Sequence, residues 1–253
     1  MKLLVDVGNT RLKWASIADD ARLRPGGVFA HAGGSLVGEL RREWGGLARV
    51  EAAWIASVVS AAREEELATF VRERFGLRAQ FVRSPAAALG VRNAYAQPER
   101  LGVDRFLALA AAHARDARLQ VLVSAGTALT VDALDADGSH LGGLIVASPQ
   151  AMRQAIVAGT ARVDARGGQL QAYPRSTADA VVTGSLYAAA GAIERFRASL
   201  VRAGEALPPL LLGGGGADEL EPLLAPVERV HDLVLHGLAL WAREAAANAA
   251  PDG

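Results

Sequence analysis

The sequence predicts an α/β protein made of two duplicated halves, each with a mixed sheet flanked by helices. Strand-like and helix-like segments alternate along the 253 residues. Both tight hairpins and longer crossovers join the strands, a combination typical of mixed rather than purely parallel sheets. A strand–turn–strand segment at residues 3–15 also recurs at residues 121–133. A chain of this length with 51% hydrophobic residues can bury the cores of one large or two medium domains.

The first half is expected to combine a sheet with two long helices. Apolar residues alternate with period two where strands are predicted, and they recur at helical spacing where helices are predicted. The first helix is expected to end at Gly76, a residue typical of helix C-termini. In chain order, the predicted elements are strands over 3–7 and 11–15, a strand over 52–58, a helix over 62–76, a strand over 79–82, an irregular loop over 84–101 and a helix over 102–117.

The second half is expected to begin with another strand–turn–strand segment. Asp137-Gly138 predicts a further hairpin turn, because this dipeptide readily adopts the positive φ angles of tight turns. In chain order, the predicted elements are two strands within 119–134, a strand over 140–147, helices near 149–158 and 177–203, a strand within 209–214 and a helix over about 232–247.

The repeated segment aligns position by position across the two halves. Asp6 falls over Ser124, Gly8 over Gly126 and Asn9 over Thr127, with apolar strands on both sides. We therefore expect a duplicated domain, with one half over residues 1–117 and the other over 118–253. A chance similarity of two hairpins is the alternative interpretation.

The residues of the first turn suit the binding of phosphate together with a divalent cation. A glycine turn lets backbone N–H groups point into one concavity, and Asn9 and Thr10 add side-chain donors. Asp6 would repel a bare phosphate, so its presence indicates a cation between carboxylate and phosphate. The alternative is that Asp6 and Asn9 merely stabilise an ordinary hairpin.

Composition and missing motifs exclude several other classes of protein. The chain has no cysteine and a formal net charge of zero, so we expect no disulfide or thiolate chemistry and neither nucleic acid nor a membrane as a partner. There is no P-loop motif, no nucleophile elbow and no paired histidine spacing typical of a metal site. The glycine run in LLLGGGGADEL fits either a helix N-terminus that receives a nucleotide or a surface loop. Because no signal peptide or long apolar stretch is present, we expect a cytoplasmic protein.

Three motifs together resemble the type III pantothenate kinases. They are DVGNT at residues 6–10, YAQPERLGVDR at 95–105 and SAGTALTVD at 124–132. The resemblance continues through GGLIVASPQAMRQAI, RSTADAVVTGSLYAAAG and HDLVLHGLALWA, and so covers nearly the whole chain. This family belongs to the superfamily of acetate and sugar kinases, Hsc70 and actin. The resemblance therefore implies two ribonuclease H-like domains with an ATP cleft between them.

The resemblance implies ATP-dependent phosphorylation of pantothenate to 4'-phosphopantothenate, the first step of coenzyme A biosynthesis. Asp104 matches the base that accepts the hydroxyl proton, although a carboxylate at a helix start also stabilises the helix dipole. Arg105 is suited to the pantothenate carboxylate. The implied ATP-binding residues are Asp6 (near magnesium), Val7, Gly8, Asn9, Thr10, Arg11, Leu12, Lys13 and Thr127, and the implied pantothenate-binding residues are Tyr95, Gly102, Val103, Asp104, Arg105 and Thr177.

One position departs from the family pattern. Most relatives have an aspartate in place of Ser124, where it helps to hold a potassium or ammonium ion, so the monovalent cation site is in doubt here. The family resemblance also implies a homodimer whose substrate pocket is completed across the subunit interface. Two alternatives remain at this stage: a kinase for another small hydroxylated acceptor, and a non-catalytic accessory protein of the same fold.

Overall fold

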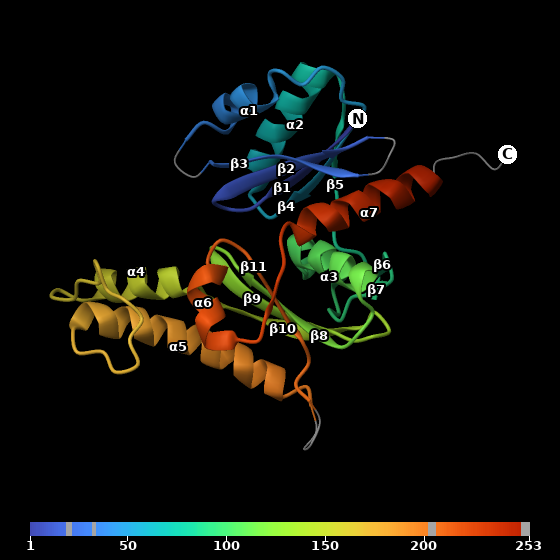
Figure 1. Cartoon of the computed structure of the whole chain (residues 1–253). Helices are drawn as coiled ribbons and strands as arrows, with labels where there is room; N and C mark the ends of the chain where they lie inside the picture. Colours follow the sequence, from blue (N-terminus) through green and yellow to red (C-terminus); the bar gives the residue numbers. More distant parts are fainter. Residues whose placement is uncertain (19–21, 32–33, 202–205, 249–253) are drawn as a thin grey trace. The chain divides into compact units, whose positions relative to one another are not determined.

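The computed structural model describes residues 1–18, 22–31, 34–201 and 206–248. The chain divides into two compact α/β units (Figure 1). Unit 1 comprises Met1–Ala117, the short segment Asp137–Ser139 and the C-terminal segment from Asp232 onward. Unit 2 comprises Arg118–Ala136 and His140–His231.

Unit 1 contains a five-stranded mixed sheet in the order β3-β2-β1-β4-β5. The strand β1 pairs antiparallel with β2 and parallel with β4. The strands are β1 (Lys2–Val7), β2 (Arg11–Ile17), β3 (Leu23–Ala30), β4 (Ala52–Ser57) and β5 (Ala79–Phe81), and the helices are α1 (Leu36–Trp44), α2 (Ala61–Phe75), α3 (Val103–Arg115) and α7 (Leu233–Asn248).

The two faces of this sheet bury different helices. Leu3, Val5 and Val7 of β1 lie in one core with residues of α1 and α2. Leu4 lies in a second core with residues of α3 and α7. Successive side chains of a strand point to opposite faces, so Asp6 shares the face of Leu4 and points toward the side of α3 and α7. Lys13 shares that face by the same rule, because its neighbour Leu12 belongs to the first core.

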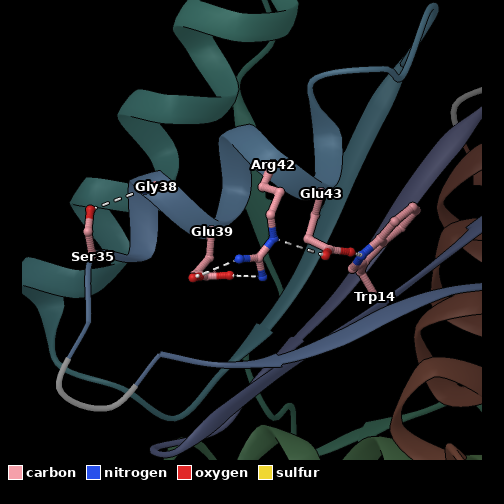
Figure 2. Close-up of polar contacts among 6 residues, drawn as sticks. All are labelled: Trp14, Ser35, Gly38, Glu39, Arg42 and Glu43. Carbon is pink, nitrogen blue, oxygen red and sulfur yellow. Dashed lines mark hydrogen bonds and ion pairs between the residues drawn. The ribbon is translucent and has the colours of Figure 1, made fainter.

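Helix α1 is fixed to the opposite face of the sheet through Trp14, the residue after Lys13 (Figure 2). The Trp14 indole Nε1 donates a hydrogen bond of 3.4 Å to Glu43, and its ring meets Trp44 edge to face. The helix is capped by Ser35, whose hydroxyl accepts from the amide of Gly38. These contacts hold β2 in place immediately beside Lys13.

The segment between β5 and α3 contains a short hairpin and one turn of 3-10 helix. The elements are β6 (Ala87–Ala88), β7 (Val91–Arg92) and η1 (Pro98–Arg100). Arg92 donates from its backbone amide to the carbonyl of Gly138 at 2.9 Å and pairs through its guanidinium with Asp137. A Cβ atom on Gly138 would lie 1.9 Å from the carbonyl oxygen of Gly90, so only glycine allows this close approach. The segment Asp137–Ser139 is therefore part of unit 1.

Unit 2 repeats the sheet topology of unit 1, in the order β10-β9-β8-β11-β12. The strand β8 pairs antiparallel with β9 and parallel with β11, as β1 does with β2 and β4. Apolar residues of β8 and β9 pack against α5 and α6 in a single core. The elements are β8 (Gln120–Ala125), β9 (Ala128–Leu134), β10 (His140–Ala147), β11 (Leu210–Gly213), β12 (Glu228–Arg229), α4 (Pro149–Gly159), α5 (Thr177–Ala198) and α6 (Ala217–Leu224).

The prediction of two equivalent halves with mixed sheets is confirmed, with several differences of detail. The segment 84–101, expected as an irregular loop, contains β6, β7 and η1, and the short strand β12 was not expected. The strand β3 and helix α1 were not expected from the sequence. Helix α5 ends at Ala198 rather than at residue 203, and residues 202 and 203 lie outside the described residues. The expected boundary placed residues 118–253 in one half, whereas the segment from Asp232 onward groups with unit 1. The physical reason is that apolar residues of α7, including Leu235 and Leu238, complete the core on the α3 side of the first sheet.

Candidate active site

The turn between β1 and β2 is closed by backbone contacts and supported from β3. The Gly8 amide donates to the Arg11 carbonyl at 3.0 Å. His31, which is 3% exposed, lies with Nε2 2.8 Å from the carbonyl oxygen of Gly8. The side chains of Asn9 and Arg11 are exposed. This turn therefore has a fixed backbone and accessible polar side chains.

Two residues that the resemblance assigns to ATP are part of the core instead of the surface. Val7 and Leu12 are fully or almost fully buried with the apolar residues of the first core. Their side chains hold the turn to the sheet, so any contact they make with a nucleotide comes from the backbone.

Lys13 lies beside Asp6 and forms an ion pair with a residue from the far end of the chain. Asp6 and Lys13 are directly opposite each other in the β1–β2 pairing. The Lys13 Nζ atom is 3.0 Å from Oδ1 of Asp232, and both side chains are about two-fifths exposed. Asp232 precedes α7, and its carbonyl accepts the amide of His236 at 3.0 Å.

The surroundings of Asp6 disfavour its charged form, because the one nearby ammonium does not offset burial and the neighbouring carboxylates. Burial raises the pKa of Asp6 from 3.8 to about 7, and the carboxylate of Asp104 raises it as well. The Lys13 ammonium lowers this pKa, while Asp232 adds a further smaller increase. Two further carboxylates and only one ammonium therefore influence Asp6, and a divalent cation bound with phosphate would supply the missing positive charge.

Asp104 lies in the first turn of α3, two residues after Gly102, which caps the helix. Its Oδ1 atom accepts the backbone amide of Arg105 at 2.9 Å. A Cβ atom on Gly102 would lie 2.5 Å from that same oxygen, so the glycine leaves the carboxylate its space. The buried hydroxyl of Ser84 donates to the Leu101 carbonyl at 2.7 Å and fixes the approach to the helix. The Asp104 side chain remains partly exposed, as a group that contacts a substrate must be.

Arg105 and Tyr95 form a pair next to Asp104. The guanidinium of Arg105 donates to the Tyr95 hydroxyl at 3.0 Å and lies over the Tyr95 ring. Arg105 is only 6% exposed and Val103 is 5% exposed. Of the unit 1 residues expected to bind pantothenate, Tyr95 and Asp104 therefore offer more accessible side chains than Val103 and Arg105.

The loop that carries Tyr95 is held by Asn93, a residue that the sequence motifs did not single out. The Asn93 side-chain amide donates to the carbonyls of Pro85 and Pro98, at 3.2 and 3.0 Å. Its oxygen accepts the backbone amide of Tyr95 at 3.0 Å. One side chain thus ties both ends of the loop together.

The remaining expected site residues belong to unit 2. Ser124, near the end of β8, and Thr127, on the turn between β8 and β9, are exposed. In this turn the Gly126 amide donates to the Ala128 carbonyl. This turn is one residue shorter than the β1–β2 turn. Thr177 is exposed at the first residue of α5. Unit 2 thus presents its own glycine turn with accessible hydroxyl groups.

The glycine run after β11 is packed against this second turn. The Gly216 amide donates to the carbonyl of Ala125 at 2.9 Å. Gly214 has φ +92°, and a Cβ atom there would lie 2.5 Å from the same carbonyl oxygen. The run therefore forms a close turn that leads into α6, the strand–turn–helix arrangement that the sequence suggested.

Sequence reasoning missed His31, Asn93 and Asp232. The side chains of His31 and Asn93 form hydrogen bonds with the backbone of other segments. A sequence motif does not reveal contacts of this kind. The Asp232–Lys13 pair spans 219 positions, so only the folded chain brings it together.

Among the residues that the structure describes, no three acidic, histidine or cysteine side chains converge to hold a metal. In the same described ranges, no helix has the length and apolar character needed to span a membrane.

Comparisons with known proteins identify the family. The family model described as type III pantothenate kinase matches residues 2–199. The chain is 41% identical to the type III pantothenate kinase of Thiobacillus denitrificans over 96% of each chain. It is also 41% identical to that of Aromatoleum aromaticum, covering 98% of this chain and 100% of the relative.

Solved structures of lower identity share the fold. A conserved protein from Campylobacter jejuni aligns with a TM-score of 0.63 at 18% identity, covering 97% of this chain and 99% of that one. Component A of (R)-2-hydroxyglutaryl-CoA dehydratase from Acidaminococcus fermentans aligns with a TM-score of 0.56 at 12% identity, covering 97% and 98% of the two chains. The motifs, the duplicated sheets and the sequence relatives agree, and the chain belongs to the type III pantothenate kinase family.

Proposed function

We propose that this protein transfers the γ-phosphoryl group of ATP to the terminal hydroxyl of pantothenate. The observation that carries the proposal is the grouping of Asp6, Lys13 and Asp104 on one face of the unit 1 sheet, in a chain of the type III pantothenate kinase family. Phosphoryl transfer requires positioned substrates and positive charge near the moving group rather than covalent chemistry from the protein. The three residues supply a metal-binding carboxylate, an ammonium and a base.

The β1–β2 turn binds the phosphates of ATP in this proposal. Exposed Asn9 and half-buried Thr10 donate to phosphate oxygens, while the Lys13 ammonium neutralises part of their charge. Asp6 would help to hold a magnesium ion bound with the nucleotide, and that ion would stabilise charge on the transferred phosphoryl group. Thr127, on the equivalent turn of unit 2, is the second nucleotide contact.

Asp104 accepts the proton of the attacking hydroxyl. Its carboxylate is fixed by the Arg105 amide and by the space that Gly102 leaves, so it is oriented before substrate binds. A carboxylate is a weak base, yet a loose transition state for phosphoryl transfer makes little demand on base strength. The preorganised position of Asp104 is therefore more important than its basicity.

Tyr95 and Arg105 recognise pantothenate. Arg105 is suited to the carboxylate of pantothenate, and its hydrogen bond to Tyr95 places both groups together. Gly102 and Val103 line the same region next to Asp104. Thr177 of unit 2 is the remaining proposed contact.

We also propose that the active form is a homodimer. The edge strand β10 and the neighbouring helices α4 and α5 of unit 2 carry exposed apolar side chains, which a second copy of the chain would cover. The most exposed of them is Ile145, at 65%. These side chains are Leu141, Leu144, Ile145, Ile156, Val157 and Tyr187.

The experiment that tests the function is a coupled assay for ADP release with and without pantothenate. We expect ADP release only with pantothenate, accompanied by one new phosphomonoester detected by mass spectrometry. Sugars and short hydroxy acids serve as alternative acceptors in the same assay. ADP release that does not depend on pantothenate, or a faster reaction with another acceptor, would replace this proposal.

A further inference from the structure

Asp232 lies beside Lys13, which follows the β1–β2 turn, although the two residues are far apart in the sequence. Its carboxylate is 3.0 Å from the Lys13 ammonium, and it contributes to the electrostatic environment of Asp6. The backbone of Asp232 has φ +52°, in the left-handed region that residues other than glycine rarely adopt. Such a conformation persists when the surroundings fix it and is found more often at functional positions.

The pairing of β1 with β2 places the Lys13 ammonium where it can form an ion pair with Asp6, and Asp232 is a second acid that competes for it. Asp6 and Lys13 are opposite each other and share one face of the sheet, so their charges attract directly. If the ammonium of Lys13 settled on Asp6, neither group would be available to the metal or the phosphates. Asp232 offers Lys13 a different partner on the side of α7.

Lys13 itself is a residue that composition sets apart. The chain has 27 basic residues, and only Lys2 and Lys13 are lysine rather than arginine. The ammonium of lysine is a compact charge on a flexible stem, and it can exchange one oxygen partner for another more readily than a forked guanidinium. A lysine at this position can therefore move from Asp232 to a phosphate oxygen.

We propose that Asp232 is a positioning residue of the nucleotide site, which holds the Lys13 ammonium away from Asp6 until phosphate binds. The Asp6 carboxylate then remains open to the metal, and Lys13 remains open to a phosphate oxygen. The inference rests on the proposed function for the identity of the ligand, because it assumes that the turn receives a nucleotide with magnesium.

A simpler role for Asp232 is to stabilise the start of α7. Its carbonyl accepts the first helical hydrogen bond, and an acid at a helix N-terminus is favourable. Asparagine is as good as aspartate at this position and also tolerates the left-handed conformation. Asp232→Asn therefore removes the charge and keeps the backbone, and Asp232→Gly provides a second variant that keeps the same conformation.

The test is a double-mutant cycle between Asp232→Asn and Lys13→Met, with the affinity for ADP and magnesium measured by calorimetry. We expect Asp232→Asn and Asp232→Gly each to weaken binding by about three- to ten-fold, the range of a partly exposed ion pair and a charged hydrogen bond. In the Lys13→Met background, Asp232→Asn should change the affinity less than two-fold, about the error of such cycles. Pantothenate affinity and melting temperature should match the unmodified protein.

A matched control is Glu39→Gln, which removes another ion-paired carboxylate of unit 1, on α1 (Figure 2). It should leave nucleotide affinity unchanged. Equal weakening by Asp232→Asn in both backgrounds would overturn the proposal, and so would tighter binding, which would mean that Asp232 competes with phosphate. Absence of magnesium–nucleotide binding by the unmodified protein would instead contradict the proposed function.

Discussion

The Nε2 atom of His31 donates a hydrogen bond of 2.8 Å to the carbonyl oxygen of Gly8. A carbonyl only accepts, so this ring nitrogen carries the proton. The His31 amide also donates to the carbonyl of Thr10, at 3.1 Å. One buried residue directly after β3 thus fixes two carbonyls of the β1–β2 turn.

We expect His31→Ala to raise the KM for ATP by about ten-fold, because the loss of a buried hydrogen bond leaves the Gly8 carbonyl unpaired at a cost of roughly 1–3 kcal/mol. The KM for pantothenate should change little. His31→Gln retains a donor near the same position and should recover part of the loss. Steady-state kinetics on the three proteins decides the point, and equal KM values for ATP would show that the turn needs no support from β3.

Asp104→Asn should lower kcat by about 10²–10⁴-fold, the usual range for loss of a general base. Asparagine keeps the size of the side chain and its acceptor for the Arg105 amide, so binding of both substrates should remain within a few-fold. Calorimetry with pantothenate checks the binding and the coupled assay checks turnover. A collapse of pantothenate binding would make Asp104 a binding residue rather than the base.

Asp6→Asn should stabilise the protein at high pH in the absence of nucleotide and magnesium. The folded-state pKa of Asp6 is raised from 3.8 to about 7, so the folded protein binds more protons than the unfolded chain between these values. Stability from this group is therefore full below about pH 4 and is lost as the pH rises through 7. Between about pH 4 and pH 7, the free energy of unfolding of the variant should come to exceed that of the unmodified protein by a few kcal/mol, on the order of 2–4.

Urea unfolding at pH 5 and pH 8 measures this difference. Asp6→Asn should also lose turnover with magnesium and ATP, so the gain in stability accompanies a loss of function. If the two proteins unfold at the same urea concentration at pH 8, the surroundings of Asp6 do not destabilise its charged carboxylate.

Asn93→Ala should raise the KM for pantothenate by about ten-fold and leave the KM for ATP unchanged. The substitution removes three hydrogen bonds that hold the Tyr95 loop, and each is worth roughly 0.5–1.5 kcal/mol. Asn93→Asp keeps the acceptor for Tyr95 but places a carboxylate against two carbonyl oxygens, so it should be no better than alanine. Initial rates with each substrate varied in turn give the result, and an equal rise in both KM values would indicate general loosening of unit 1.

The activity should depend weakly or not at all on potassium or ammonium. Ser124 is an exposed neutral side chain where the family pattern has a carboxylate, and hard cations bind best to charged oxygen ligands. Ser124→Asp should create or strengthen activation by potassium. The measurement compares turnover in sodium-only buffer with turnover after adding potassium. Activation of the unmodified enzyme many-fold by potassium would show that the site does not need the aspartate.

Elements with a regular apolar pattern were predictable from the sequence, whereas β3 and α1 were not. The strand β3 contains Pro25, Gly26 and Gly27, which normally interrupt strands. Gly26 is required because a Cβ atom there would lie 2.2 Å from the ring of Trp14. The signal for this strand therefore lies in the tertiary contact and not in the local sequence. Helix α1 is short and polar, and its buried side is set by Trp44, which packs with Trp14 and Phe70.

The candidate site was predictable where it follows a contiguous motif. Asp6, Asp104 and Lys13 lie in such motifs, and the alternation of side chains in β1 and β2 places Asp6 and Lys13 on one face. The contributions of His31 and Asp232 come from segments without a motif, and they depend on how β3 and α7 pack. Long-range packing of this kind is what sequence spacing does not encode.

The position of α7 also sets the order in which unit 1 can be finished as the chain is made. The strands with Asp6 and Lys13 leave the ribosome first, and Asp232 follows 219 residues after Lys13. Until then, Leu4, Ala15 and Leu107 lack the apolar partners that α7 provides. The nascent protein must leave the part of the sheet face that α7 covers exposed during the synthesis of all of unit 2, although α3 is already present. A chaperone would be useful at that stage. A chain whose synthesis stopped before residue 232 would contain every residue of the β1–β2 turn, but it would lack α7, which completes the core on the α3 side of the first sheet.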